Sequence, residues 1–234
     1  MTDVPSYAAL LDDLVSMQYA EREECLEETA LDLVLDGDTE AFRQWLKVTP
    51  ALAINARSAK TGRSFLHWAS AEGHKEIVKI LLDETEANMM LRTMLGGCTA
   101  LHLAVTNNHR SIVFQLLSHG ADVLARDKFG CAPMHYVRSV NVAKLLTQYG
   151  GRVLDYNAKR RNALQSVLLQ AELDRETDCI EIDPAVTKEL QKYLQTQADL
   201  EYKAKLTQIR ELKQRTKAQQ KAEDKRRKKT LKDC

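Results

Sequence analysis

The chain has 234 residues, of which 44% are hydrophobic and 29% charged, so it suits one folded domain with attached segments. Only nine glycines and four prolines argue against a turn-rich all-β protein, and no apolar run approaches the roughly 20 residues of a membrane span. The formal net charge of +1 hides a gradient, because residues 1–60 carry −7, residues 61–183 carry zero and residues 184–234 carry +8. We therefore expect an acidic head, a neutral middle and a basic tail.

No secretory signal peptide is visible in the sequence. Its first residues, Met-Thr-Asp-Val-Pro, lack the basic segment followed by an apolar one that a signal peptide has. The five cysteines are odd in number, widely spaced and without a Cys-x-x-Cys pair, which disfavours a disulfide framework or a zinc knuckle. Reduced thiols fit the cytosol or the nucleus, so we expect a cytoplasmic or nuclear protein that does not engage a membrane.

The first element expected is an acidic helical cap over residues 1–29. Tyr7, Leu10, Leu14 and Met17 lie on one stripe of such a helix. An amphipathic helix at this place would cover the open end of a stacked core. The alternative is a docking segment through which the chain escorts a basic client, as a chaperone does.

Two segments of the middle region have nearly the same sequence. Residues 62–82 read GRSFLHWASAEGHKEIVKILL and residues 97–117 read GCTALHLAVTNNHRSIVFQLL, with Gly, Leu-His, Ala, a second His, Ile-Val and Leu-Leu at the same offsets. A third copy opens at Gly130 as GCAPMHYV. A repeat of this length predicts a solenoid, in which each unit of helix, tight turn, helix and extended turn buries its apolar face on the next.

This pattern resembles the ankyrin-repeat family. The motif GxTxLHxA, then Gly-His or Asn-His, then IVxxLL and HGADV recurs with a period of about 33 residues. The resemblance implies an all-α solenoid of helix-turn-helix units. Independently of it, the apolar residues from Leu190 to Leu212 predict a long charged helix at the C-terminal end. The repeats are expected at about residues 30–58, 59–93, 94–126 and 127–153, with a degenerate repeat at 154–197.

The outer repeats depart from the pattern. In residues 30–58, Gly37-Asp38 stands at the Gly-His turn and Trp45-Leu46 at the Leu-Leu position. The fourth repeat lacks one helical turn and the Gly-His turn, so its helix pair should be short or tilted. In the fifth, Asn162-Ala163-Leu164 resembles a first-helix start, residues 171–183 read as an acidic exposed loop, and Asp183-Pro184 should open the second helix.

Residues 198–234 form a basic tail, helical or disordered. Tyr202, Leu206 and Ile209 follow a heptad, but polar residues occupy the next seam positions, which disfavours a sustained coiled coil. Near its end the tail carries five consecutive cations: Lys225, Arg226, Arg227, Lys228 and Lys229. Such a run is typical of a nuclear-import signal or a nucleic-acid patch, and equally of a solvated end.

Nothing in the sequence predicts catalysis. The pairs His67–His74 and His102–His109 fall on the family's Leu-His and Gly-His positions, where the resemblance implies hydrogen bonds to backbone within the repeat rather than metal ligation. No phosphate-binding loop, nucleophile elbow or nucleophile–base–orienter trio is visible. We therefore expect no enzyme, no cofactor, no metal and no small-molecule substrate.

Binding of one or more partner proteins remains as the expected function, in an adaptor or regulator that presents its concave face. The positions not needed for the solenoid core should contact the partner: Lys60, Arg63, Glu72, Leu95, Thr106, Asn107, Arg126, Lys128 and Phe129. Phe129 is the strongest apolar anchor among them because cations flank it and aromatic side chains dominate binding hot spots. The alternative is that Phe129 packs back on a neighbouring turn.

Overall fold

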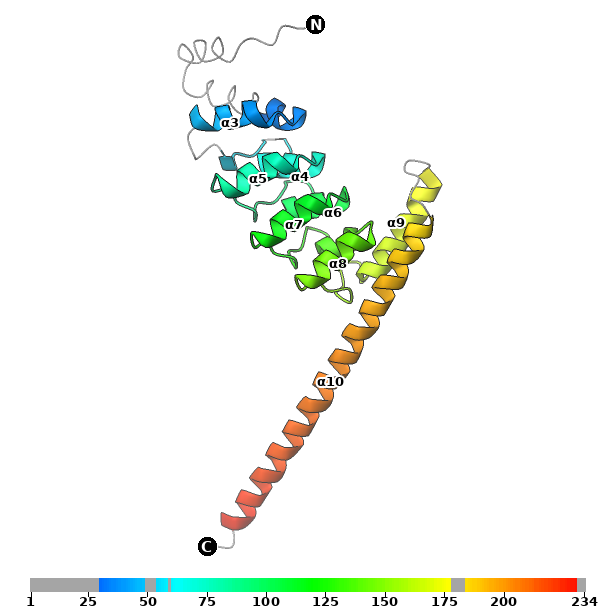
Figure 1. Cartoon of the computed structure of the whole chain (residues 1–234). Coiled ribbons are helices and arrows are strands. Elements are labelled where there is room, and N and C mark those ends of the chain that lie inside the picture. The colour runs from blue at the N-terminus through cyan, green and yellow to red at the C-terminus, as the bar shows by residue number, and fades with distance from the viewer. Residues whose placement is uncertain (1–29, 49–53, 59, 178–183, 231–234) are drawn as a thin grey trace, which may run out of the picture.

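The computed structural model describes residues 30–48, 54–58, 60–177 and 184–230, and every regular element in these residues is a helix. The helices stack along the chain as a solenoid, and the last helix runs on far beyond it (Figure 1). This confirms the all-α repeat fold. The cap expected over residues 1–29 lies outside the described residues.

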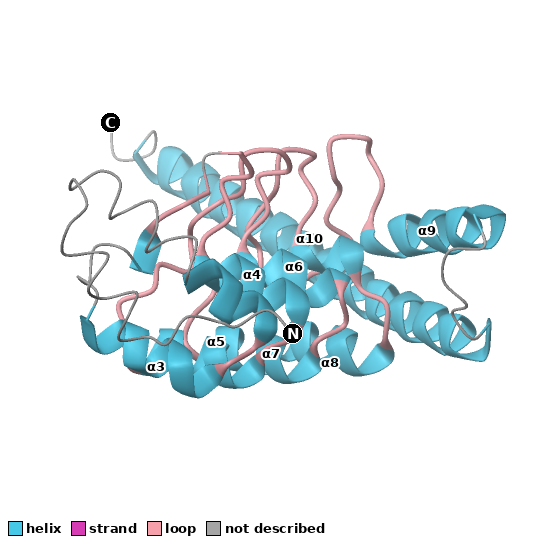
Figure 2. Ribbon diagram, turned by 90° about the horizontal axis from the view of Figure 1, so that it is seen from above, coloured by secondary structure: helices cyan, strands magenta, loops and turns pink. Residues whose placement is uncertain are grey.

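The repeats pair a first and a second helix. The helix that covers residues 30–36 is followed by α3 (Thr39–Val48), and the next units are α4 (Phe65–Glu72) with α5 (Lys75–Asp83), α6 (Ala100–Thr106) with α7 (Arg110–Ser118), η2 (Pro133–Tyr136) with α8 (Val140–Gln148), and α9 (Ala163–Thr177) with α10 (Pro184–Thr230). Figure 2 shows α3, α5, α7 and α8 in one row, α4 and α6 in a second row, and the long turns beyond that second row.

The core follows the repeated apolar positions. Leu101 in α6 is 1% exposed, and Ile112 and Leu116 in α7 are equally buried. An aromatic cluster joins the first two repeats, since the ring of Trp45 stacks on Phe42 at 5.7 Å and meets the edge of Phe65 at 5.5 Å between centroids. Each repeat therefore buries its apolar face against its neighbours, which is what makes a solenoid stable.

The tight turn inside each repeat needs a left-handed residue. Gly73 has φ +94°, and a Cβ there would lie 2.6 Å from the ring of His109 in the next repeat, so only glycine fits. In the next turn Asn108 takes this conformation with φ 61°. The following histidines donate from Nε2 to the preceding repeat, His74 to the Leu35 carbonyl at 3.0 Å and His109 to the Ala71 carbonyl at 2.9 Å.

Histidines at the start of the first helices tie repeats together in the other direction. His67 accepts the Ser64 N–H on Nδ1 at 3.2 Å and donates from Nε2 to the Cys98 carbonyl of the next repeat. His102 repeats both contacts with Thr99 and Cys131. The expectation of backbone hydrogen bonds within the repeat is thus wrong for Nε2, because the turns of neighbouring units bring a carbonyl within its reach.

The fourth repeat is short, as expected, but the fifth differs from its expectation. The first helix of the fourth is a single 3₁₀ segment of four residues, after which the chain extends at Val137 with ψ 133°. The expectation of an exposed loop at residues 171–183 is wrong for 171–177, because α9 continues to Thr177 through Ala, Glu and Leu, which favour helix. Residues 178–183 lie outside the described residues.

The last helix begins at Pro184, as expected, and packs on α8 and α9 through buried Leu190, Leu194 and Ala198. It continues without interruption to Thr230, so no structural break separates the expected repeat region at 197 from the tail at 198. None of the helices in the described residues is long and apolar enough to cross a membrane.

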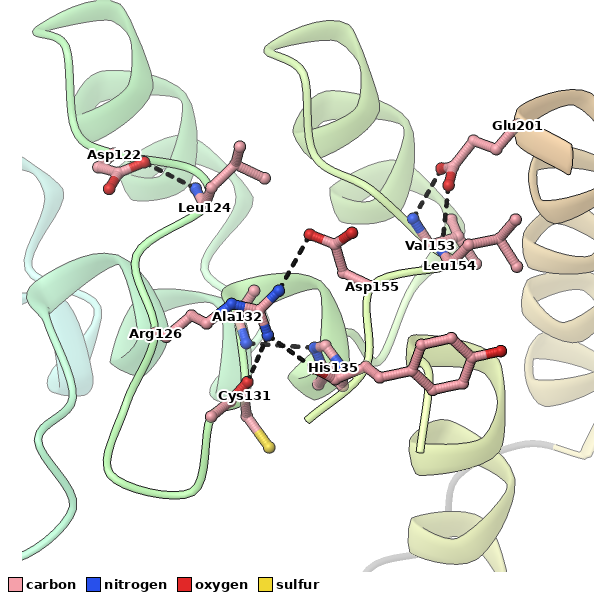
Figure 3. Close-up of polar contacts among 12 residues, drawn as sticks. Asp122, Leu124, Arg126, Cys131, Ala132, His135, Val153, Leu154, Asp155 and Glu201 are labelled. Carbon is pink, nitrogen blue, oxygen red and sulfur yellow. Dashed lines mark hydrogen bonds and ion pairs between the residues drawn. The ribbon is translucent and has the colours of Figure 1, made fainter. Parts of the chain in front are cut away.

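Glu201 anchors α10 to the end of the solenoid. Its two carboxylate oxygens accept the backbone N–H groups of Val153 at 2.7 Å and Leu154 at 3.0 Å (Figure 3). In the third repeat the corresponding N–H, that of Leu124, is accepted by Asp122 two residues earlier. Arg152 occupies that aspartate position in the fourth repeat, so α10 supplies from a distance the carboxylate that the local sequence lacks.

Candidate protein-binding surface

The extended turns form one continuous row, which we call the tip row: residues 58, 60–63, 93–98, 127–131 and 157–161. Backbone hydrogen bonds join each tip to the next, with Met94 N–H on the Thr61 carbonyl at 2.9 Å, Lys128 N–H on the Gly96 carbonyl at 2.9 Å, and Ala158 N–H on the Phe129 carbonyl at 3.0 Å. Figure 2 shows these loops side by side beyond α4 and α6. Backbone hydrogen bonds therefore join the tips into one surface, and the loops are not independent of one another.

Large apolar side chains stand exposed on adjacent tips, and Leu95 and Phe129 are more exposed than Met94 at 50%. Leu95 is 78% exposed and Phe129 is 57% exposed. The alternative in which Phe129 packs back on a neighbouring turn therefore does not describe this structure. Hydrogen bonds already hold the backbone of both tips, so little conformational entropy is lost when a partner buries these side chains. Both positions therefore suit contact with a partner.

The predicted cations of the tip row also hold it together. Arg126 donates to the Gly130 carbonyl at 2.7 Å and the Tyr156 carbonyl at 2.8 Å, and forms an ion pair with Asp155 at 3.1 Å (Figure 3). Lys128 donates from Nζ to the carbonyl of Met94. These groups are engaged within the fold, so their first role is to keep the tips in place.

Arg92 has the same role one repeat earlier and was missed by the sequence reasoning. Its guanidinium donates to the Gly97 carbonyl at 3.4 Å and to the carbonyl of Arg126. The available signal was its spacing, since Arg92 precedes Arg126 by 34 residues and stands at the same place before its tip.

Of the other predicted contact positions, some make contacts within the fold and others are exposed to solvent. Arg63 lies over the ring of Trp68 at 4.4 Å, whereas Lys60 is exposed at the first tip. Asn107 donates to the Ala71 carbonyl at 2.7 Å and so belongs to the turn between repeats. Glu72 is exposed at the end of α4.

A pocket of about 330 Å³ opens beside the fourth repeat. Thr106, another predicted position, lines it from the end of α6, and Phe129 lines it from the tip row. The Thr106 hydroxyl donates to the His102 carbonyl at 2.8 Å, so its methyl group is the part left to meet a ligand. The structure thus brings two of the predicted residues to one cavity that the sequence did not reveal.

The buried ionisable groups suit structure rather than chemistry. Burial lowers the pKa of His67 to about 4 and also lowers the pKa of His102 and of His135. Burial, followed by the nearby Asp127 carboxylate, raises the pKa of the Cys98 thiol, which makes it a weak nucleophile at neutral pH. In the part of the chain that the structure describes, no group of three or more His, Cys, Asp or Glu side chains could hold a metal ion.

Comparison with known proteins identifies the repeat. A family profile of ankyrin repeats, in three copies, matches residues 30–127. Residues 30–127 belong to the ankyrin-repeat family. The α9 and α10 region, with Glu201 and most of the pocket, lies outside this match.

Relatives match the same region. The chain is 35% identical over 94 residues to the mitochondrial disaggregase of Rattus norvegicus, covering 39% of this chain and 14% of the relative. It is 34% identical over 110 residues to the human ankyrin repeat domain-containing protein SOWAHD, covering 44% and 34%. It is 34% identical over 86 residues to the probable 26S proteasome regulatory subunit p28 of Saccharomyces cerevisiae, covering 37% and 38%. The chain therefore spans well under half of each of these relatives.

The basic run of the tail lies near the end of α10, which covers residues up to Thr230. Beyond Leu206 every side chain described, up to Gln220, is exposed. The helix carries this region away from the ankyrin repeats (Figure 1), so the run Lys225 to Lys229 does not form part of the tip row.

Proposed function

We propose that the chain is a non-catalytic adaptor or regulator that binds a partner protein on its tip row and the adjoining row of α4 and α6. Ankyrin repeats are generally protein-interaction modules. The observation that carries the proposal is the pair of exposed side chains, Leu95 and Phe129, on neighbouring tips whose backbones are hydrogen-bonded to one another. Lys60 at the first tip and Glu72 at the end of α4 supply exposed charges.

Affinity capture with the full chain and with substituted chains tests the proposal. The double substitution Leu95→Ala and Phe129→Ala should remove captured proteins while the melting temperature stays within a degree or two, because neither residue is in the core. Phe114→Ala is the matched control, since Phe114 is 52% exposed but lies on α7, in the other row. Equal capture by wild type, double variant and control would refute the tip row as the binding surface.

The tail supports a second candidate, an import signal or polyanion contact in a nuclear protein. Its five consecutive cations lie on a helix that leaves the repeats, where an import adaptor or a nucleic acid could reach them. Changing Arg226, Arg227, Lys228 and Lys229 to Ala should shift a fluorescently tagged chain from nucleus to cytoplasm. A gel shift at two salt concentrations identifies direct nucleic-acid binding, which weakens steeply with salt. No change in either readout would leave only a solvated end.

A third candidate, escort of a basic client by the acidic head, rests on residues 1–29, which lie outside the described residues. Removing residues 1–29 should abolish an escort complex and leave tip-row binding intact. The two outcomes distinguish the escort from the adaptor.

A further inference from the structure

The pocket beside the fourth repeat exists because that repeat is short. A first helix of ordinary length would continue from η2 into the space in front of α9, but the chain turns to extended backbone at Val137 after one 3₁₀ turn. The space is bounded by Phe129 of the tip row, by Val167 and Ala171 of α9, and by Leu190 of α10. Its walls are thus largely apolar, and its volume of about 330 Å³ exceeds that of any single side chain.

The charged side chains that line the pocket have one sign, and the nearest described carboxylate, that of Asp127, is taken up behind the lining by Tyr136 and the Cys131 N–H. Arg138, Lys159 and Arg161 line the pocket, and its described lining contains no aspartate or glutamate. No ion pair joins any of these three cations to another residue in the part of the chain that the structure describes. Arg126 differs, because Asp155 already neutralises it. The pocket therefore combines an apolar interior with three cations that are paired with no described carboxylate, which is complementary to an anionic ligand that carries an apolar group.

We propose that this pocket receives an acidic peptide segment of the partner protein, with one bulky apolar side chain inserted among Phe129, Val167 and Leu190 and with flanking carboxylates on Arg138, Lys159 and Arg161. This rests on the proposed function and names the chemistry of the partner. A peptide fits better than a free small anion because the interior is apolar and continues into the tip row through Phe129. Acidic residues on both sides of the inserted side chain would match the cations on two sides of the pocket, Arg138 just after η2 and Lys159 and Arg161 on the fourth tip.

Fluorescence anisotropy with synthetic peptides on the full chain tests the proposal. The probe is a labelled heptapeptide with Leu or Phe at its centre and three Asp or Glu residues on either side. It should bind at 50 mM salt and weaken at 500 mM, because the contacts with the rim are screened. Peptides with Ser at the centre, or with Lys in place of the acidic residues, should bind at least tenfold more weakly.

Two sets of substitutions locate the binding. Reversing Arg138, Lys159 and Arg161 to Glu should weaken the peptide at least tenfold, whereas reversing Lys75, Lys79 and Arg110 to Glu, an equal change of net charge on α5 and α7, should not. Thr106→Trp should fill the cavity and block the peptide without removing any cation. Circular dichroism and the melting temperature verify that each variant is folded.

The proposal is overturned if no acidic peptide binds, if the lysine peptide binds equally well, or if both charge-reversal sets have the same effect. It is also overturned if light scattering shows a dimer of the wild type that the pocket variants alone convert to monomer, because the occupant is then a second copy of the chain. Failure of the wild-type chain to bind the acidic peptide, together with protein capture that depends on Leu95 and Phe129, would refute this inference and leave the proposed function standing.

Discussion

The histidines of the repeats are the residues that join one unit to the next. His67 and His102 each accept a hydrogen bond at the start of their own helix and donate to the following repeat. A carbonyl oxygen only accepts, so Nε2 must carry the proton and the ring must be neutral to leave Nδ1 free as an acceptor. Protonation would therefore break a contact within the repeat besides introducing a buried charge.

Acid should destabilise the fold through these buried histidines. The folded-state pKa of His67, about 4, lies below its ordinary value of 6.5, so the unfolded chain binds the proton first as pH falls. The part of the free energy of unfolding that depends on neutral His67 is present above pH 6.5 and is lost between pH 6.5 and about 4. The loss is at most about 1.4 kcal/mol per pH unit per histidine. Urea unfolding at pH 7.5, 6 and 5 measures this, and His67→Gln should make the dependence less steep.

His119 provides the opposite sign as a control. The Gln115 carbonyl and then Asp83 raise the pKa of His119, which donates to Asp83 at 2.8 Å on the surface. This stabilisation is present below pH 6.5 and is lost as pH rises through the raised value, and exposure keeps it below about 1 kcal/mol. His119→Gln should therefore leave the acid loss slightly steeper. A slope that His67→Gln does not change would contradict the assignment.

Leu101 and Leu95 separate core from surface on the same residue type. Leu101→Ala should lower the free energy of unfolding by about 2–5 kcal/mol, because the side chain is 1% exposed and its loss leaves a cavity. Leu95→Ala, at a side chain 78% exposed, should change it by less than about 0.5 kcal/mol. Chemical denaturation measures both, and similar losses would mean that the tip row is part of the core.

Among the elements, α10 is the one that completes the solenoid. Without α10, the apolar faces of α8 and α9 would be exposed. The buried side chains of α10 cover these faces. Glu201 then satisfies two backbone N–H groups that Arg152 cannot. A charge-assisted hydrogen bond of this kind stabilises by about 1.5–3 kcal/mol.

Removing this carboxylate should loosen α10, and restoring a local one should rescue it. Glu201→Ala should lower the free energy of unfolding by about 1–3 kcal/mol and speed hydrogen exchange at Val153 and Leu154. Adding Arg152→Asp should recover part of the loss by recreating the Asp122 contact. Glu211→Ala, at an exposed position on the same helix, serves as the control. No rescue would mean that the Glu201 contact owes its effect to the position of α10 alone.

The sequence could predict the features that recur at matched positions in successive repeats. Leu-His and Ile-Val at matched offsets predicted the helix pairs and the place of Phe129 at a tip, but not whether its side chain is exposed. The missing turn near His135 predicted a short fourth repeat but not the pocket, because the vacant space depends on where α9 and α10 pack. Glu201 could not be predicted for a similar reason: its partner Leu154 lies 47 residues away, and the described residues contain no second copy of the contact that could have revealed it.

At the scale of the whole molecule, the folded unit extends through the first third of α10. A chain that ends at residue 183 lacks Leu190 and Leu194, whereas one that ends at residue 205 keeps them together with Glu201. The shorter chain should melt at a markedly lower temperature and lose α9 helicity, and the longer one should melt like the full chain. Circular dichroism on both compares them directly, and equal melting curves would place the end of the folded unit before α10.

The free part of α10 also sets a distance. Between Glu201 and Thr230 the helix advances by about 44 Å at 1.5 Å per residue, longer than the diameter of a small domain. If a ligand binds Lys225–Lys229 and a protein binds the tip row, as proposed above, this length of helix sets their separation. The length of this rigid helix would set the effective concentration of one bound ligand around the other. Lengthening or interrupting the helix would therefore change how often the two ligands meet without altering either binding surface.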